Sequence, residues 1–153
     1  MMSNRVVLVT GGFDPVHSGH IRYFKSAAEL GDILVVGINS DDWLMRKKGA
    51  YFLPAKERAA IIKEFRCVDK VIEFEDSDNS AKGAIHKVLE MYPTSQIIFA
   101  NGGDRGKDNI PEMDIESNRV DFVFAVGGDD KANSSSWILA DYLERERFLS
   151  KKK

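Results

Sequence analysis

Short apolar segments alternate with helical patterns along the whole chain. Segments rich in Val, Ile and Phe, each as short as a typical buried strand, occupy residues 5–10, 33–38, 69–74, 96–100 and 120–126. The spacing of apolar residues between them predicts helices over residues 19–30, 55–66, 80–91 and 134–147. Strands separated by helices of this length form crossover connections. The sequence therefore predicts an α/β fold, a Rossmann-like parallel sheet with helices on both faces.

The length of the chain predicts a single domain. A chain of 153 residues is too short for two ordinary domains, and no internal repeat or low-complexity linker divides it. We expect a domain over residues 1–148 and a disordered basic tail over residues 149–153, which ends in three lysines.

Charge and cysteine content narrow the class of protein. A net charge of −2 argues against a general binder of nucleic acid or anionic membranes. The single cysteine, Cys67, excludes an intramolecular disulfide, and the apolar run near the N-terminus is too short for a signal sequence or a membrane span. These features are typical of a cytoplasmic protein that has neither nucleic acid nor a membrane as its partner.

Two histidines, His17 and His20, follow the first predicted strand and a glycine-rich turn, at the start of the first predicted helix. Backbone N–H groups and the helix dipole favour an anion there, and residues three apart lie on one face of a helix. Gly19 lies between the histidines and has no side chain to keep a phosphate away from the backbone. The pattern predicts a triphosphate site with neutral or protonated imidazoles.

Zinc is the other common use of clustered histidines. Only Cys67 and His86 remain elsewhere as soft ligands, which argues against a closed structural zinc site. His86 lies on a predicted helix without a partner and is typical of a solvated surface histidine.

Residues 11–20 read Gly-Gly-Phe-Asp-Pro-Val-His-Ser-Gly-His and resemble the signature of the nucleotidyltransferase superfamily. This superfamily includes cytidylyltransferases, sugar-phosphate and pantetheine-phosphate adenylyltransferases and, more distantly, class I aminoacyl-tRNA synthetases. The resemblance implies a five-stranded sheet in the order 3-2-1-4-5 and catalytic roles for His17 and His20. It also implies nucleotide contacts from Gly11, Gly12, Phe13, Asp14 and Gly19.

The segment after the second strand, residues 39–49, is predicted to be a loop. It resembles the family's V-x-S-D strand end followed by a lysine before glycine, so Lys48 is the matching catalytic lysine. A lysine is a mobile point charge that can follow phosphate oxygens; the other reading is a solvated basic loop. Asp41 binds an acceptor hydroxyl or caps the next helix. Arg58 matches an arginine that closes over the acceptor phosphate, or is an exposed helix arginine paired with a neighbouring glutamate.

Two further segments match the same family. After the fourth strand, Gly102, Gly103 and Asp104 resemble a motif that contacts ribose and base, although the three residues also suit a plain turn. At the start of the last helix, Ser134, Ser135 and Ser136 resemble a segment that binds the β- and γ-phosphates, although serine is also a common helix cap. The family's cation after these serines is absent, because residues 137–139 are Trp-Ile-Leu.

Together these motifs imply a nucleotidyltransferase. A phosphorylated or phosphonate acceptor attacks the α-phosphorus of a nucleoside triphosphate and releases pyrophosphate, with Mg²⁺ held mainly by the nucleotide phosphates and no protein metal ligand. The short, one-domain layout favours CTP. The alternatives are an adenylyltransferase that uses ATP on a sugar phosphate, as in heptose-phosphate adenylyltransferases, and a non-catalytic nucleotide sensor or scaffold. Such small transferases are commonly homodimers, although no segment of the sequence identifies an interface.

Overall fold

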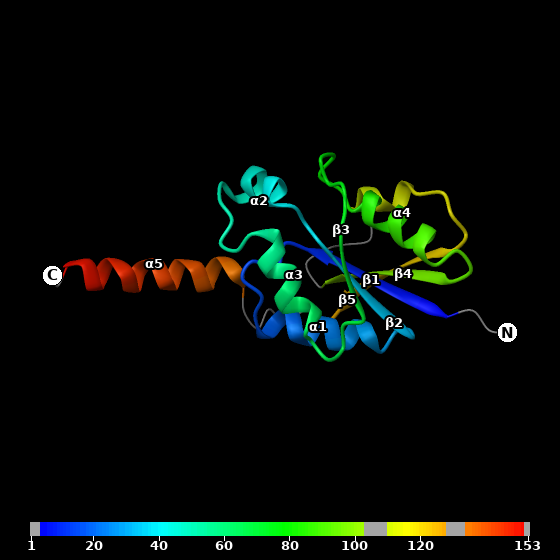
Figure 1. The fold of residues 1–153 in the computed structure, drawn as a ribbon, viewed down its shortest axis with the longest axis horizontal. Coiled ribbons are helices and arrows are strands. Elements are labelled where there is room, and N and C mark those ends of the chain that lie inside the picture. The colour runs from blue at the N-terminus through cyan, green and yellow to red at the C-terminus, as the bar shows by residue number, and fades with distance from the viewer. Residues whose placement is uncertain (1–3, 103–109, 128–133, 152–153) are drawn as a thin grey trace.

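The computed structural model describes residues 4–102, 110–127 and 134–151. Figure 1 shows a twisted sheet flanked by helices, with the last helix extending away from them. The strands are β1 (Arg5–Gly11), β2 (Ile33–Ile38), β3 (Lys70–Glu73), β4 (Gln96–Gly102) and β5 (Val120–Val126). The helices are α1 (Ser18–Ala28), α2 (Asp41–Lys48), α3 (Ala55–Lys63), α4 (Lys82–Met91), α5 (Ser135–Lys151) and the short 3₁₀ helix η1 (Pro111–Asp114).

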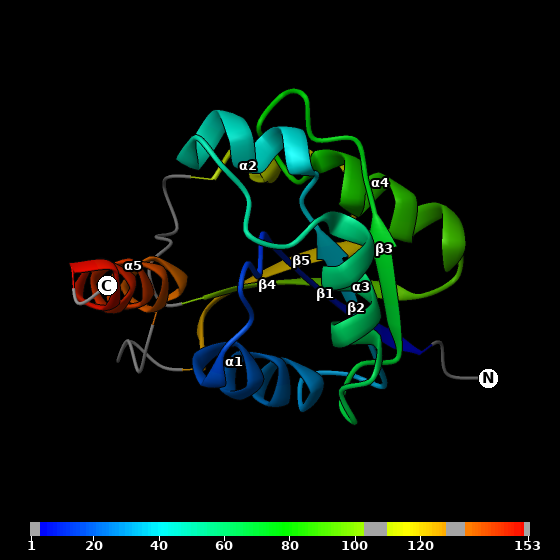
Figure 2. The same cartoon turned by 60° about the vertical axis from the view of Figure 1, so that its left-hand side comes forward.

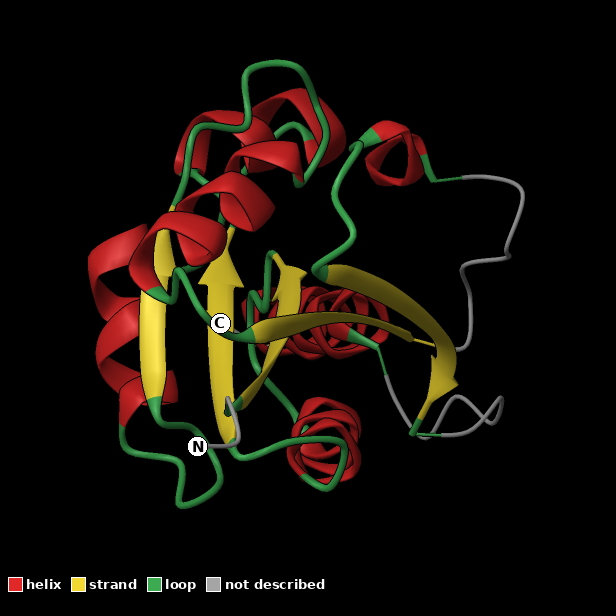
Figure 3. Ribbon diagram, turned by 90° about the vertical axis from the view of Figure 1, so that its right-hand side faces the viewer, coloured by secondary structure: helices red, strands yellow, loops and turns green. Residues whose placement is uncertain are grey.

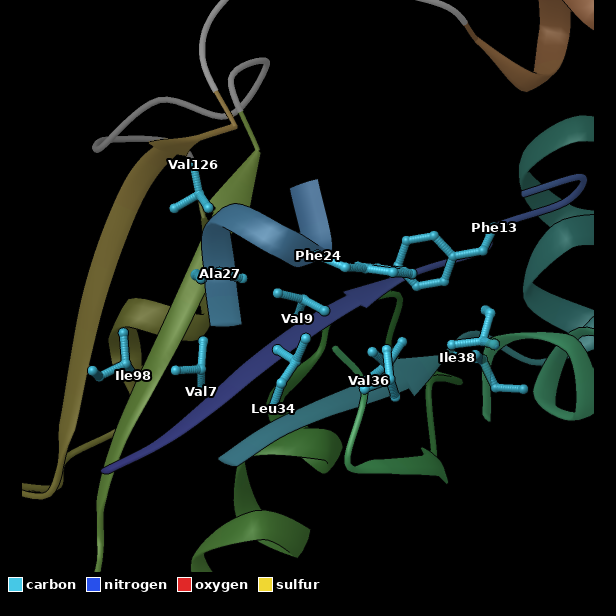
Figure 4. Close-up of a cluster of buried hydrophobic side chains, with 13 residues drawn as sticks. Val7, Val9, Phe13, Phe24, Ala27, Leu34, Val36, Ile38, Ile98 and Val126 are labelled. Atoms are coloured by element: carbon cyan, nitrogen blue, oxygen red, sulfur yellow. The ribbon is translucent and has the colours of Figure 1, made fainter. Parts of the chain in front are cut away.

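The five strands are all parallel and follow the order β3-β2-β1-β4-β5, which confirms the predicted sheet. Alternate residues of β1 point to opposite faces. Val7 and Val9 join a cluster that includes Phe24 of α1 and Ile62 of α3, and this cluster is drawn in Figure 4. Leu8 joins the opposite cluster, which α4 covers. Helices therefore lie on both sides of the sheet (Figures 2 and 3), and its central strands are apolar throughout because both faces are buried.

Strands β1 and β4 separate toward their carboxyl ends. β1 pairs with β2 as far as Gly11 opposite Ile38, whereas its register with β4 runs only from Arg5 to Leu8, opposite Phe99. The chain order also reverses between β1 and β4, and open α/β sheets bind ligands at such a point. The loop after β1 borders this opening.

Two stretches differ from the sequence prediction. The prediction of a loop over residues 39–49 is wrong. Helix α2 occupies most of this segment, between an N-cap at Ser40 and a left-handed C-cap at Gly49. Only Leu44 of α2 is buried, so the segment lacks the apolar periodicity by which the other helices were predicted. α5 continues to Lys151, so residues 149–151 of the expected disordered tail are helical, and residues 152–153 lie outside the described part.

No helix in the described ranges is long and apolar enough to cross a membrane.

Candidate active site

His17 and His20 form the N-terminal cap of α1. His17 is the N-cap residue, and its Nδ1 accepts a hydrogen bond from the backbone N–H of Gly19 at 3.0 Å. Nδ1 of His20 accepts from the backbone N–H of His17 at 3.2 Å, which completes a reciprocal capping box. Since an imidazole nitrogen that accepts is unprotonated, the proton of each neutral ring is on Nε2.

The two rings stack with their centroids 3.8 Å apart, and the Phe13 ring lies edge-on to His20 at 5.0 Å. Burial, followed by the nearby charges of His17 and Lys48, lowers the pKa of His20 to about 3. Of the two protonation states that the sequence left open, the neutral one is therefore the state of His20 near pH 7. A neutral imidazole with its proton on Nε2 is a hydrogen-bond donor and not a cation.

The glycines of the first loop make room for neighbouring side chains. A Cβ atom on Gly11 would lie 2.8 Å from the Phe13 ring, and one on Gly12 would lie 2.9 Å from Leu44 of α2. Phe13 itself has a positive φ of 51° and is buried against Phe24 of α1. The glycines thus let the loop pack between α1 and α2. Their predicted contacts with a nucleotide, like those of Phe13 and Gly19, stay predictions.

Asp14 has a structural role that was not predicted from the sequence. Its side chain is buried, and both of its carboxylate oxygens accept backbone N–H groups, one from Phe52 and one from Leu53 at 2.7 Å. The carboxylate therefore ties the first loop to the segment between α2 and α3. Its position among these N–H donors does not favour the predicted contact with the nucleotide.

Arg58 is fully buried, with 0% of its side chain exposed, so the reading as an exposed helix arginine is wrong. Its guanidinium donates to the backbone carbonyls of Gly12, Asn39 and Leu53 and, at 2.6 Å, to the Asp41 carboxylate. These bonds join the first loop, the end of β2 and the segment before α3. Arg58 therefore positions these segments in this structure, and its predicted contact with an acceptor phosphate stays a prediction.

Asp41 is the partner of Arg58 and also accepts the backbone N–H of Ala55 at 2.9 Å, at the first residue of α3. A third of the Asp41 side chain remains exposed. Of the two roles predicted for Asp41, the contact with the start of the next helix is present. The contact with an acceptor hydroxyl stays a prediction.

Lys48 is the last residue of α2 and is exposed. Its charge acts on His20, which places the end of α2 on the same side of the molecule as the capped start of α1. The preceding residue, Lys47, instead lies over the Trp43 ring, 5.6 Å from its centroid. Lys48 is therefore the lysine of this pair whose charge acts on His20.

The serine segment meets the first loop directly. Oγ of Ser135 donates to the carbonyl of Pro15 at 2.7 Å, across 120 residues of sequence. Oγ of Ser134 accepts the backbone N–H of Trp137 at 3.0 Å and so caps α5, and Ser136 is exposed. The N-termini of α1 and α5 therefore converge beside the loop after β1, and each directs the positive end of a helix dipole there.

Asp76, which lies after β3, is a residue of this region that was not predicted from the sequence. Its buried carboxylate accepts from Oγ of Ser40 at 2.7 Å, from the backbone N–H of Ser40 and from the amide of Asn39, and so it fixes the start of α2. Its position at the carboxyl end of a strand was the available signal, because such ends meet at one edge of the sheet. Gly102 ends β4, whereas Gly103 and Asp104 lie outside the described residues.

Within the described ranges, no group of three or more His, Cys, Asp or Glu side chains is arranged to hold a metal ion. Histidine and lysine, which surround the first loop, are not the oxygen ligands that Mg²⁺ prefers.

This geometry agrees with the family to which the sequence is similar. Residues 8–141 match the family described as cytidylyltransferase-like, so the match runs from β1 into α5. The chain belongs to this family. Membership supports a nucleotidyltransferase, as the motifs implied.

Curated relatives carry the name Bifunctional protein HldE. The protein of Pelobacter propionicus is 32% identical over 143 residues, which is 90% of this chain and 28% of the relative. That of Syntrophotalea carbinolica is 34% identical over 143 residues, 90% of this chain and 27% of the relative. The chain thus spans little more than a quarter of the length of these relatives.

Solved structures share the fold. A lipopolysaccharide core biosynthesis protein from Thermoplasma volcanium aligns with a TM-score of 0.59 and 28% identity, over 80% of this chain and 96% of that one. A putative nicotinate-nucleotide adenylyltransferase from Vibrio parahaemolyticus aligns with a TM-score of 0.57 over 94% of this chain and 88% of that one. At 16% identity, the second likeness concerns the fold alone.

Proposed function

We propose that this protein transfers AMP from ATP to the phosphate of a phosphorylated sugar and releases pyrophosphate. The observation that carries the transfer chemistry is that two helix N-termini meet at the loop after β1, one of them capped by a stacked pair of histidines. Donors and dipoles fixed in this way stabilise charge that develops on a leaving phosphate.

The choice of ATP over CTP rests on the relatives. The sequence favoured CTP on the basis of the chain's short, one-domain layout. That criterion does not discriminate, because this chain also covers 88% of the length of a protein described as a putative nicotinate-nucleotide adenylyltransferase. The HldE relatives, together with the resemblance of Lys48 and Gly49 to heptose-phosphate adenylyltransferases, support ATP and a sugar phosphate.

In the proposed reaction, an oxygen of the acceptor phosphate forms a bond to the α-phosphorus as the bond to the bridging oxygen of pyrophosphate breaks. The acceptor oxygen is already anionic, so no covalent enzyme intermediate is required. Nε2–H of His20 donates to the phosphate oxygens on which charge accumulates. Lys48 neutralises part of that charge as a mobile cation, and the amides at the start of α5 receive the terminal phosphates.

We further propose that Mg²⁺ accompanies the nucleotide and is held mainly by the phosphates, since the described residues contain no cluster of three or more side chains arranged to hold a metal ion. When bound, the ion neutralises phosphate charge.

The proposal is tested by pyrophosphate release and by mass spectrometry of the product. ATP and CTP are each supplied with Mg²⁺ and with a panel of sugar 1-phosphates and sn-glycerol 3-phosphate. We expect an ADP-sugar from one of the sugar phosphates and at least a tenfold preference for ATP in kcat/KM. A CDP product would overturn the adenylyl assignment while leaving the transferase intact. Nucleotide binding without pyrophosphate release from any acceptor would favour the sensor alternative.

A further inference from the structure

Helix α5 exposes large apolar side chains along most of its length. It spans 17 residues, about 25 Å, and extends away from the sheet and its covering helices (Figures 1 and 2). Ile138 and Leu139 near its start are half-buried, but every residue from 140 to 149 is exposed. Tyr142, Leu143 and Leu149 are 51%, 55% and 61% exposed.

Such a helix is not expected to stand alone in water. An isolated helix of this length is marginally stable, and helices in proteins gain most of their stability by packing an apolar face. Contiguous exposed apolar surface on a folded protein commonly marks an interaction site.

The spacing of residues identifies one face of α5. Tyr142, Arg145, Glu146 and Leu149 follow the spacing i, i+3, i+4, i+7 and so lie on one side of the helix. Ile138 lies four residues before Tyr142, so this face continues the side on which α5 begins to be buried. It consists of one apolar residue at each end and one acid and one base in the middle.

This face is complementary to itself when turned through a half-rotation. In two antiparallel copies related by a two-fold axis between residues 145 and 146, Tyr142 lies opposite Leu149 and Arg145 lies opposite Glu146, each twice. Apolar residues therefore meet apolar residues, and each charge meets its opposite. A parallel pair would instead place Arg145 opposite Arg145 and Glu146 opposite Glu146.

We propose that the α5 helices of two copies of this chain pair antiparallel through Tyr142, Arg145, Glu146 and Leu149, and that this contact makes the protein a homodimer. Leu143 and Phe148 flank the face on its two edges and are 55% and 60% exposed. Together, the exposed parts of these apolar side chains on both copies offer on the order of 1,000 Å², near the lower end of specific interfaces. A dimer that dissociates in the micromolar range is the expected result.

The test is a charge exchange followed by sedimentation equilibrium from low to high micromolar concentration. Arg145→Glu places two glutamates opposite each other, and Glu146→Arg places two arginines opposite each other. Each single variant should weaken the dimer at least tenfold. The double variant Arg145→Glu/Glu146→Arg restores opposite charges across the two-fold axis and should return the dissociation constant to near the wild-type value.

Two further variants serve as controls. Glu144→Arg and Arg147→Glu change charge on the opposite side of α5 and should leave the dissociation constant unchanged. Because Arg145→Glu also brings a second acid near Asp141 within its own helix, circular dichroism follows the helix content. The double variant keeps that intrahelical repulsion, so restored dimerisation reports the contact between chains.

A wild-type protein that is monomeric at every concentration would overturn the proposal. So would a dimer that both single variants leave intact, which would point to another surface, or a double variant that stays as weak as the single ones.

Discussion

At the scale of single residues, the Nδ1 atoms of His17 and His20 both accept backbone N–H groups at the start of α1. The hydrogen bonds that begin the helix also set which nitrogen of each neutral ring carries the proton. A change that disturbs the cap would therefore disturb the donors of the site as well.

Replacing His20 with alanine should reduce turnover far more than nucleotide affinity. Nε2–H is expected to meet charge that develops only as pyrophosphate leaves, and the loss of one such donor costs about 3 kcal/mol, roughly a hundredfold in rate. Steady-state pyrophosphate release gives kcat, and calorimetry gives the dissociation constant for ATP. An unchanged kcat in the folded variant would remove His20 from the mechanism.

The pKa of His20 also predicts how stability depends on pH. The pKa falls from 6.5 in the unfolded chain to about 3 in the folded protein, so between these values the unfolded chain binds the additional proton. The contribution of neutral His20 to the free energy of unfolding is complete above pH 6.5 and is lost as the pH falls toward 3. Over this range the free energy of unfolding falls by at most about 1.4 kcal/mol per pH unit. Urea unfolding of wild type and His20→Gln across this range should show a shallower slope for the variant. Equal slopes would contradict the assignment.

Lys48→Ala should raise KM for the triphosphate or for the acceptor, and it should also lower kcat. Lys48→Arg should not restore full activity, because a planar guanidinium follows phosphate oxygens less well than a point charge. Removing this charge should also raise the pKa of His20, because Lys48 is one of the groups that lower it. An NMR titration of the histidine signals measures that shift. Lys47→Ala is the matched control and should leave both the kinetics and the titration unchanged.

At the scale of helices and strands, burial determined what the sequence could predict. The central strands β1, β2 and β4 are mostly buried on both faces, so their continuous apolar runs were recognisable. α2 buries only Leu44 and was missed. The protonation state of His20 could not be predicted for a related reason: it depends on packing by Phe13 and on a charge at the end of α2. The roles of Asp14 and Arg58 depend in part on contacts 38 and 46 residues away, respectively, which no local pattern reveals.

Two serines at the start of α5 should have different functions, Ser135 in stability and Ser136 in binding the triphosphate. Ser135→Ala removes the hydrogen bond to Pro15 and should cost about 1 kcal/mol of unfolding free energy as well as activity. Ser136→Ala should leave stability unchanged and raise KM for the triphosphate, because the Ser136 side chain is exposed at the same helix N-terminus. Thermal melts and steady-state kinetics of the two variants separate these effects. Equal losses of stability would argue against the division.

At the scale of the whole molecule, Arg58 joins parts of the fold that are distant in sequence. Arg58→Ala should destabilise the protein by about 3–5 kcal/mol, because it removes the buried cation that pairs with Asp41 and that donates to three backbone carbonyls. Urea unfolding measures the loss. A variant with near wild-type stability would show that water replaces the guanidinium. If Arg58 instead bound the acceptor, KM for the acceptor would rise with stability unchanged.

The bonds made by Asp14 and Arg58 have a consequence for engineering substrate range. Both side chains form hydrogen bonds to the backbone of Phe52 and Leu53, in the segment between α2 and α3, and both belong to elements outside that segment. The segment follows Lys48 and is an obvious place to exchange a loop for that of a relative with another acceptor. A transplanted loop would fit only if it presented the same two backbone N–H groups and the same carbonyl to this carboxylate and this guanidinium. Backbone shape, more than the identity of the transplanted side chains, would decide which exchanges succeed.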